Sequence, residues 1–173
     1  MNIRYENLSY AIRERDGEKP VFSLGHGQID HASITALIGS DRAAQRAFLE
    51  IAAGLLQPTD GRLTYGTLGK DGRWRYSPEI PHERLALVRS KRNSFLPWLR
   101  RRQDYPALLR TALLRRPELL LLDEPSAPIR EDEELEIDEL LLETTRKNGT
   151  TVILISGDTE RLARLKALTL AVT

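Results

Sequence analysis

The chain contains 173 residues, 29% of which are charged, and it carries a formal net charge of +1 with no cysteine. This length suits one domain with a sizeable core and is too short for two ordinary domains. The small net charge argues against a global attraction to nucleic acid or acidic lipid, and the absence of cysteine excludes disulfides and thiolate metal sites. No apolar stretch approaches the roughly 18 residues of a membrane span. We therefore expect a single cytoplasmic domain, residues 1–173.

Apolar segments of strand length alternate with amphipathic segments along the chain. In order, the pattern predicts strands over 3–11, 21–29 and 34–38, a helix over 43–56, a hairpin of 63–65 and 74–76, a strand over 85–88, a helix begun by Asp104 and Pro106, a strand over 119–122, a helix over 133–147, a strand over 151–155, a helix from Thr159 and a strand over 167–172. Buried strands that alternate with helices indicate a parallel sheet with right-handed crossovers. We expect an α/β core of about 31–59 and 81–173, joined to an antiparallel part of about 1–30 and 60–80.

Two acidic residues follow the most apolar of these strands. Residues 119–122 are four leucines without polar alternation, which is typical of a strand buried on both faces. Asp123 and Glu124 come next. Because open α/β sheets bind ligands at the carboxyl ends of their strands, these carboxylates are the candidate catalytic groups. The three histidines have no metal-ligand spacing and receive no role: His26, His31 and His82.

Four segments, taken in order, carry a resemblance to a known family: 34–39, 53–61, 115–125 and 151–156. The combination of Ala-Gly-Leu-Leu-Gln-Pro-Thr at 53–59 with Leu-Leu-Leu-Leu-Asp-Glu-Pro at 119–125 is specific. In these segments the chain resembles the ATP-binding cassette of ABC transporters. The resemblance implies a P-loop NTPase-like parallel sheet with flanking helices and a small antiparallel β subdomain. It also implies Asp123 as a magnesium ligand and Glu124 as a general base.

The phosphate loop (Walker A) of that family follows the pattern G-x-x-G-x-G-K-[ST], in which glycine amides and the lysine hold phosphate and the hydroxyl holds magnesium. Here only the first glycine is retained, in the segment Gly39, Ser40, Asp41, Arg42, Ala43, Ala44, Gln45 and Arg46. Arg42 and Ala44 carry β-carbons where the family has glycine, and Gln45 carries no charge. A charge-assisted hydrogen bond contributes about 1.5 to 3 kcal/mol, so losing the lysine and one amide weakens phosphate binding about a hundredfold or more.

The other nucleotide-contacting positions depart from the family as well. The signature Leu-Ser-Gly-Gly-Gln corresponds to Leu99, Arg100, Arg101, Arg102 and Gln103. The glutamine loop has Arg89, the D-loop aspartate position has Arg130 and the switch histidine position has Gly157. Residues 95–98 look like the segment after the glutamine loop and lead directly into the signature. We therefore expect the helical subdomain, which in the family helps to dock a membrane subunit, to be missing.

Simultaneous loss of these motifs beside retained core strands favours a catalytically inactive homologue, a pseudo-ATPase. On this hypothesis the chain needs no cofactor and serves as a protein-binding, structural or regulatory subunit. Asp123 and Glu124 are then vestigial, and they pair with Arg42 or Arg46 or cap neighbouring amides. The expected partner is a second copy, an active cassette or a membrane subunit, so that any contact with the inner face of a membrane is indirect.

Two alternative functions stay open. The chain could complete a composite site in a heterodimer with an active cassette, with residual binding or hydrolysis of magnesium ATP. It could instead bind a polyanion through Arg100–Arg102, a reading that the net charge disfavours. The basic residues of 84–116 could also pair with the acidic residues of 131–139, within the chain or across a dimer.

Overall fold

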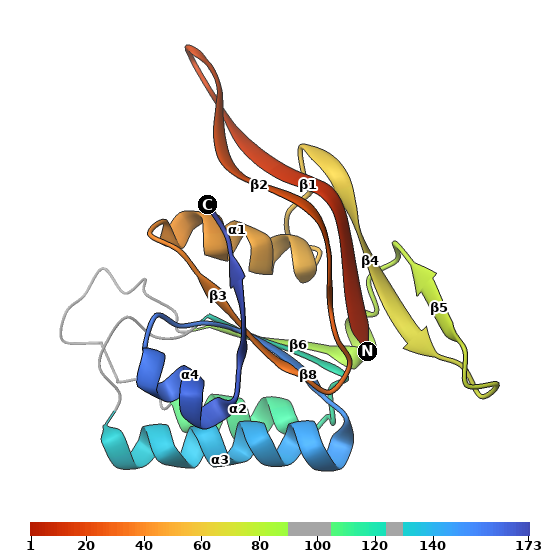
Figure 1. Cartoon of the computed structure of the whole chain (residues 1–173), viewed down its shortest axis with the longest axis vertical. Coiled ribbons are helices and arrows are strands. Elements are labelled where there is room, and N and C mark those ends of the chain that lie inside the picture. Colours follow the sequence, from red (N-terminus) through yellow and green to blue (C-terminus); the bar gives the residue numbers. More distant parts are fainter. Residues whose placement is uncertain (90–104, 124–129) are drawn as a thin grey trace.

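The computed structural model describes residues 1–89, 105–123 and 130–173. Its elements, in chain order, are β1 (Asn2–Glu14), β2 (Gly17–Ile29), β3 (Ile34–Ile38), α1 (Arg42–Ala52), β4 (Asp60–Leu68), β5 (Trp74–Ser77), the 3-10 helix η1 (His82–Arg84), β6 (Leu85–Arg89), α2 (Tyr105–Leu113), β7 (Leu119–Asp123), α3 (Glu131–Asn148), β8 (Thr151–Ile155), α4 (Thr159–Leu165) and β9 (Leu168–Ala171). They form an antiparallel sheet of order β2-β1-β4-β5 and a parallel sheet of order β6-β7-β8-β3-β9 (Figure 1). The predicted parallel sheet with flanking helices and a smaller antiparallel sheet is confirmed.

The apolar strands pack into two cores on opposite faces of the parallel sheet. Leu119 and Leu121 of β7 contact the core that also contains Phe48 of α1 and residues of the antiparallel sheet. The alternate leucines, Leu120 and Leu122, contact the core shared with α2, α3 and α4. Figure 1 shows the same layers, with α1 between the two sheets and the other helices beneath the parallel sheet. A continuous leucine run is therefore explained by a strand that is covered on both sides.

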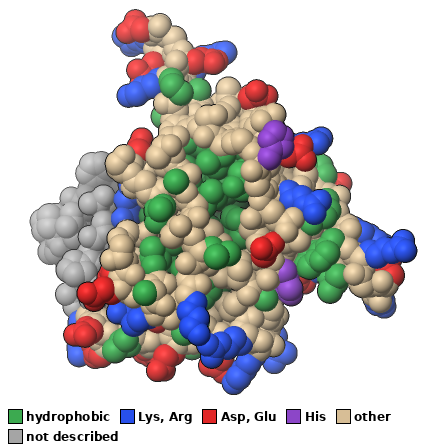
Figure 2. All heavy atoms as spheres, in the orientation of Figure 1, with side chains coloured by type: hydrophobic (Ala, Val, Ile, Leu, Met, Phe, Trp, Pro, Cys, Tyr) green, Lys and Arg blue, Asp and Glu red, His purple; other side chains and the backbone are tan. Residues whose placement is uncertain are grey.

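The hairpin of β1 and β2 is longer than expected and projects beyond the body of the protein (Figure 1). The strands predicted over 3–11 and 21–29 extend toward each other, because β1 ends at Glu14 and β2 begins at Gly17, which pairs with Glu14. Pro20 lies within β2 opposite Ala11. Since β2 is an edge strand of its sheet, a proline without a donor N–H is tolerated there. Both acidic and basic side chains cover the tip (Figure 2).

The helix ends follow local capping chemistry. Helix α1 ends at Ala52, four residues before the predicted end at 56, because Gly54 adopts a left-handed conformation with φ 72°. Side chains with a β-carbon rarely adopt this conformation, so glycine is favoured at this turn. Helix α3 begins at Glu131 rather than 133, with acidic residues in its first turn, and Gly149 caps its other end with φ 67°. Within the described residues, no helix is long and apolar enough to span a membrane.

Candidate functional site

The predicted phosphate loop, Asp123 and Arg89 lie at the carboxyl edge of the parallel sheet. The loop connects β3 to α1, Asp123 is the last residue of β7, and Arg89 is the last residue of β6. Arg89 and Asp123 are direct register partners in the parallel pair of β6 and β7. Because all carboxyl ends in a parallel sheet point the same way, the fold brings together segments that are far apart in sequence.

The phosphate loop is closed on itself by Gly39 and Gln45. Gly39 has φ 147°, and a β-carbon there would lie 2.5 Å from the carbonyl oxygen of Val172. This close approach explains why the first glycine is kept. Gln45, predicted at the family's lysine position, is 5% exposed and donates from Nε2 to the Gly39 carbonyl oxygen at 3.0 Å. The side chain at this position therefore bonds to the loop's own backbone.

Asp41 caps the N-terminus of α1. Its Oδ1 accepts hydrogen bonds from the backbone N–H of Ala43 at 2.7 Å and of Ala44 at 3.4 Å. Free amides and the helix dipole make such an end favourable for an anion. In this chain the anion that the amides meet is the carboxylate of Asp41.

Asp123 forms ion pairs with two arginines of α1. Arg46 Nε lies 3.0 Å from Asp123 Oδ2, and an Arg42 terminal nitrogen lies 3.6 Å from Asp123 Oδ1. The Asp123 side chain is 9% exposed, whereas those of Arg42 and Arg46 are 41% and 36% exposed. A guanidinium has five donors and no acceptor, so neither arginine can ligate a metal ion. Asp123 is thus neutralised by side chains of its own chain, as the sequence hypothesis of a pair with Arg42 or Arg46 expects.

The remaining predicted positions are spread along the same edge. Arg89, at the glutamine-loop position, forms an ion pair with Glu50 of α1 at 2.7 Å. Gly157, at the switch position, is exposed, and a β-carbon on it would meet nothing within 4 Å. Arg130 precedes α3 and pairs with Asp132 at 2.7 Å. Glu124, the signature positions 99–103 and the expected site of the missing helical subdomain lie outside the described residues.

Comparisons with known proteins agree with this arrangement. No protein-family model matches the chain. The aliphatic sulfonates import ATP-binding protein SsuB of Pseudomonas putida is 26% identical over 180 residues, with 87% of this chain and 66% of that protein covered. SsuB 1 of Burkholderia cenocepacia is 27% identical, with 90% and 57% covered. The chain therefore spans about two thirds or less of the length of these two relatives.

The solved structures agree at the level of the fold. A nucleotide-free ATP-binding cassette from an ABC transporter superposes with a TM-score of 0.71 at 14% identity, covering 99% of this chain and 88% of the other. Clostridium perfringens cbiO1, part of the ABC transporter complex cbiONQ, gives 0.68 at 19% identity, covering 99% and 84%. The chain therefore has the fold of ATP-binding cassettes, and its sequence is similar to import ATP-binding proteins.

The described part of the carboxyl edge, where the sequence predicts the nucleotide contacts (the nucleotide edge), is held by internal contacts. Arg46–Asp123 joins α1 to β7, and Arg89–Glu50 joins β6 to α1. No group of three or more histidine, cysteine, aspartate or glutamate side chains that could hold a metal ion occurs in the described ranges. The chemistry available at this edge is therefore ion pairing and hydrogen bonding by arginine, with Asp123 as the shared acceptor.

The chain also contains a polar contact that the sequence did not predict. The Met1 amine lies 2.7 Å from His31 Nδ1, and the ring of His31 is 5.5 Å from that of Trp74. Thr151 of β8 donates to the Met1 carbonyl oxygen, so this cluster joins the two sheets. Burial lowers the pKa of His31, and the neighbouring Met1 amine lowers it further. A single histidine has no spacing pattern, and nothing in the sequence could have indicated this role.

Proposed function

We propose that this cassette is a pseudo-ATPase, which does not hydrolyse ATP and acts as a protein-binding subunit. The observation that supports it most directly is the pair between Arg46 and Asp123, 3.0 Å apart. Arg46 stands where the family has the hydroxyl that holds magnesium. A divalent cation at Asp123 would have to displace this guanidinium and lie beside it, which Coulomb repulsion opposes.

The phosphate groups of a nucleotide meet a similar obstacle. The amides of Ala43 and Ala44 already donate to Asp41, and Gln45 brings no positive charge. Two unit charges of the same sign 4 Å apart repel by about 4 kcal/mol at the effective dielectric constant near a protein surface. A phosphate close to the Asp41 carboxylate would face a penalty of about this size. Arg42 and Arg46 could offset this penalty only by breaking their ion pairs with Asp123, which is nearly buried.

The protein-binding role is supported by what related cassettes form. Clostridium perfringens cbiO1 is part of a transporter complex, and another structural neighbour is a dimeric cassette bound to ADP and phosphate. In our proposal the partner is a second copy, an active cassette or a membrane subunit. The protein would then be cytoplasmic and reach the inner face of a membrane only through that partner.

Calorimetry with magnesium ATP tests the proposal. We expect no heat of binding up to millimolar nucleotide and no phosphate release above the buffer blank. A matched variant, Gln45→Lys with Arg46→Ser, restores the family's lysine and hydroxyl, and we expect it to bind nucleotide more tightly than the natural chain. Micromolar binding by the natural chain, with turnover abolished by Glu124→Gln, would show that the cassette is an active enzyme. Turnover that arises only on mixing with an active cassette, and that depends on Asp123, would instead establish the composite site.

A further inference from the structure

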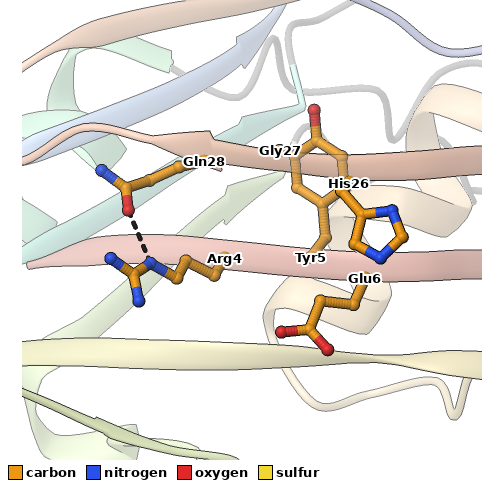
Figure 3. A pocket seen from close by; sticks show the side chains of 6 residues that line it. All are labelled: Arg4, Tyr5, Glu6, His26, Gly27 and Gln28. Carbon is orange, nitrogen blue, oxygen red and sulfur yellow. Dashed lines mark hydrogen bonds between the residues drawn. The ribbon is translucent and has the colours of Figure 1, made fainter.

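The outer face of the antiparallel sheet carries an open pocket of about 330 Å³, away from the nucleotide edge. Its lining comes from two neighbouring strands: Arg4, Tyr5 and Glu6 of β1 and His26, Gly27 and Gln28 of β2. Arg4 and Gln28 lie on one side of the pocket, with Glu6 and His26 on the other (Figure 3). Arg4, His26 and Gln28 are exposed, whereas Tyr5 packs against Phe48 in the core.

The guanidinium of Arg4 is held in place by groups from neighbouring strands. It stacks on the ring of Tyr76 of β5 at 3.8 Å from the centroid, and its Nε donates to Gln28 Oε1 at 2.7 Å. Asn2 Nδ2 donates to the Tyr76 hydroxyl at 3.1 Å. A β-carbon on Gly66 of β4 would lie 2.8 Å from the Tyr76 ring, so a larger residue at this position would clash with the ring. Each contact reduces the freedom of Arg4 before any ligand arrives.

The terminal nitrogens of Arg4 are the groups in the pocket that are available to a ligand. Within the described residues, neither of its terminal nitrogens has an acceptor, and the His26 ring has no partner. The carboxylate in the pocket lining, Glu6, accepts from both Nε and a terminal nitrogen of Arg62 at 2.8 and 2.5 Å. Glu6 is therefore neutralised by another arginine. A pre-oriented guanidinium with two open N–H groups matches the two oxygens of a carboxylate.

We propose that this pocket binds a carboxylate side chain from an acidic segment of a protein partner, with Arg4 as the anchor. The exposed Lys70 and Arg73 in the turn between β4 and β5 add positive charge on the same sheet. Complementary charge of this kind would steer an acidic segment toward Arg4. The site is distinct from the nucleotide edge, so it holds whether or not the cassette hydrolyses ATP.

A single-stranded nucleic acid fits the same surface poorly. Base recognition on a sheet uses aromatic faces on which bases stack. The face of Tyr76 toward the pocket is covered by Arg4, and Trp74 lies against His31. The open N–H groups of Arg4 are thus hydrogen-bond donors suited to a small anion.

Nuclear magnetic resonance on the full 15N-labelled chain tests the proposal at low salt. The probe is an acetylated, amidated peptide of six glutamates. We expect shifts of the Arg4 Nε–Hε signal and of the backbone amides of Glu6, His26 and Gln28. Arg4→Gln should weaken binding at least tenfold, and Tyr76→Leu should weaken it because the stacking is lost. The matched control is Arg13→Gln, an exposed arginine on the same strand outside the pocket, which should change the affinity less than twofold.

Several outcomes would overturn the assignment. Shifts confined to residues 42–46 would place the anion at the nucleotide edge. Equal affinity for inorganic phosphate at the pocket would show a general anion site, and equal affinity for a twelve-residue oligothymidylate would show a nucleic-acid surface. Absence of any peptide-induced shift would also reject the proposal, while leaving the calorimetric test of ATP binding unaffected.

Discussion

The interior of the parallel sheet and its carboxyl edge compare differently with the family pattern. In the interior, the four leucines of β7 are fully buried and divide between two cores. At the edge, only Gly39 of the phosphate-loop pattern remains, and it remains where a β-carbon would strike the Val172 carbonyl. Packing thus accounts for the leucines and for Gly39 without any reference to nucleotide chemistry.

The side chains at the predicted nucleotide-contacting positions are equally informative. Arg46 pairs with Asp123, Gln45 donates to Gly39, and Arg89 pairs with Glu50. Each replacement is a side chain that satisfies a neighbouring polar group within the chain. A nearly buried carboxylate such as Asp123 requires a compensating partner, and arginine supplies it without a metal. The edge therefore behaves in our proposal as part of the folded framework, and its substitution should change stability rather than turnover.

The largest effect should come from the interior. Leu121→Ala removes a fully buried side chain from β7, and the lost burial plus the cavity should lower the free energy of unfolding by about 2 to 5 kcal/mol. Urea denaturation followed by circular dichroism measures the change. The control, Leu114→Ala, removes a leucine that is 83% exposed and should stay within about 0.5 kcal/mol. Similar losses in both variants would contradict the division between interior and surface.

A smaller effect is expected at the edge. Asp123→Asn removes the charge that holds Arg46 and Arg42, and we expect a loss of about 1 to 3 kcal/mol, below the cost for a fully buried pair because both arginines reach solvent. Glu143→Gln breaks an exposed pair with Lys147 and should cost less than about 0.5 kcal/mol. A double-mutant cycle with Arg46→Gln isolates the coupling. If Asp123→Asn caused no loss of stability, the ion pairs of Asp123 with Arg46 and Arg42 would not be structural contacts.

Much of this contrast could be predicted from the sequence, for a physical reason. The apolar run 119–122 and the alternation of strands with helices set the layers, because burial on two faces leaves a distinct residue pattern. The pairing of Asp123 with Arg42 or Arg46 was also within reach, since Asp123 ends β7 and the arginines lie in α1, which follows β3 at the same edge of the sheet. The early end of α1 was missed because it depends on the left-handed backbone of Gly54, which helical spacing does not reveal. The contact of His31 with the Met1 amine was missed because it joins two sheets through tertiary packing alone.

The cap of α1 should contribute less than the ion pair. Asp41→Ala leaves the amides of Ala43 and Ala44 without their acceptor, and loss of such a cap typically costs about 1 kcal/mol. Asp41→Asn should be nearly neutral because asparagine caps equally well. If the carboxylate stands where an anion would bind, added phosphate should raise the melting temperature of Asp41→Ala and not of the natural chain. A response to phosphate that is the same in both would contradict that reading.

The smallest effect concerns His31, which lies between the two sheets. Burial and the Met1 amine lower its pKa below the ordinary value of 6.5, so the unfolded chain binds a proton more readily than the folded chain. Stability should then rise with pH as pH increases toward 6.5, because the slope is positive wherever the unfolded state holds more protons. Urea midpoints measured across this range should show a weaker slope in His31→Asn, while His82→Asn, at an exposed position, should retain the natural slope. Since most of the His31 ring remains near solvent, the difference should be small. If the slope were unchanged in His31→Asn, protonation of His31 would not contribute to the pH dependence of stability.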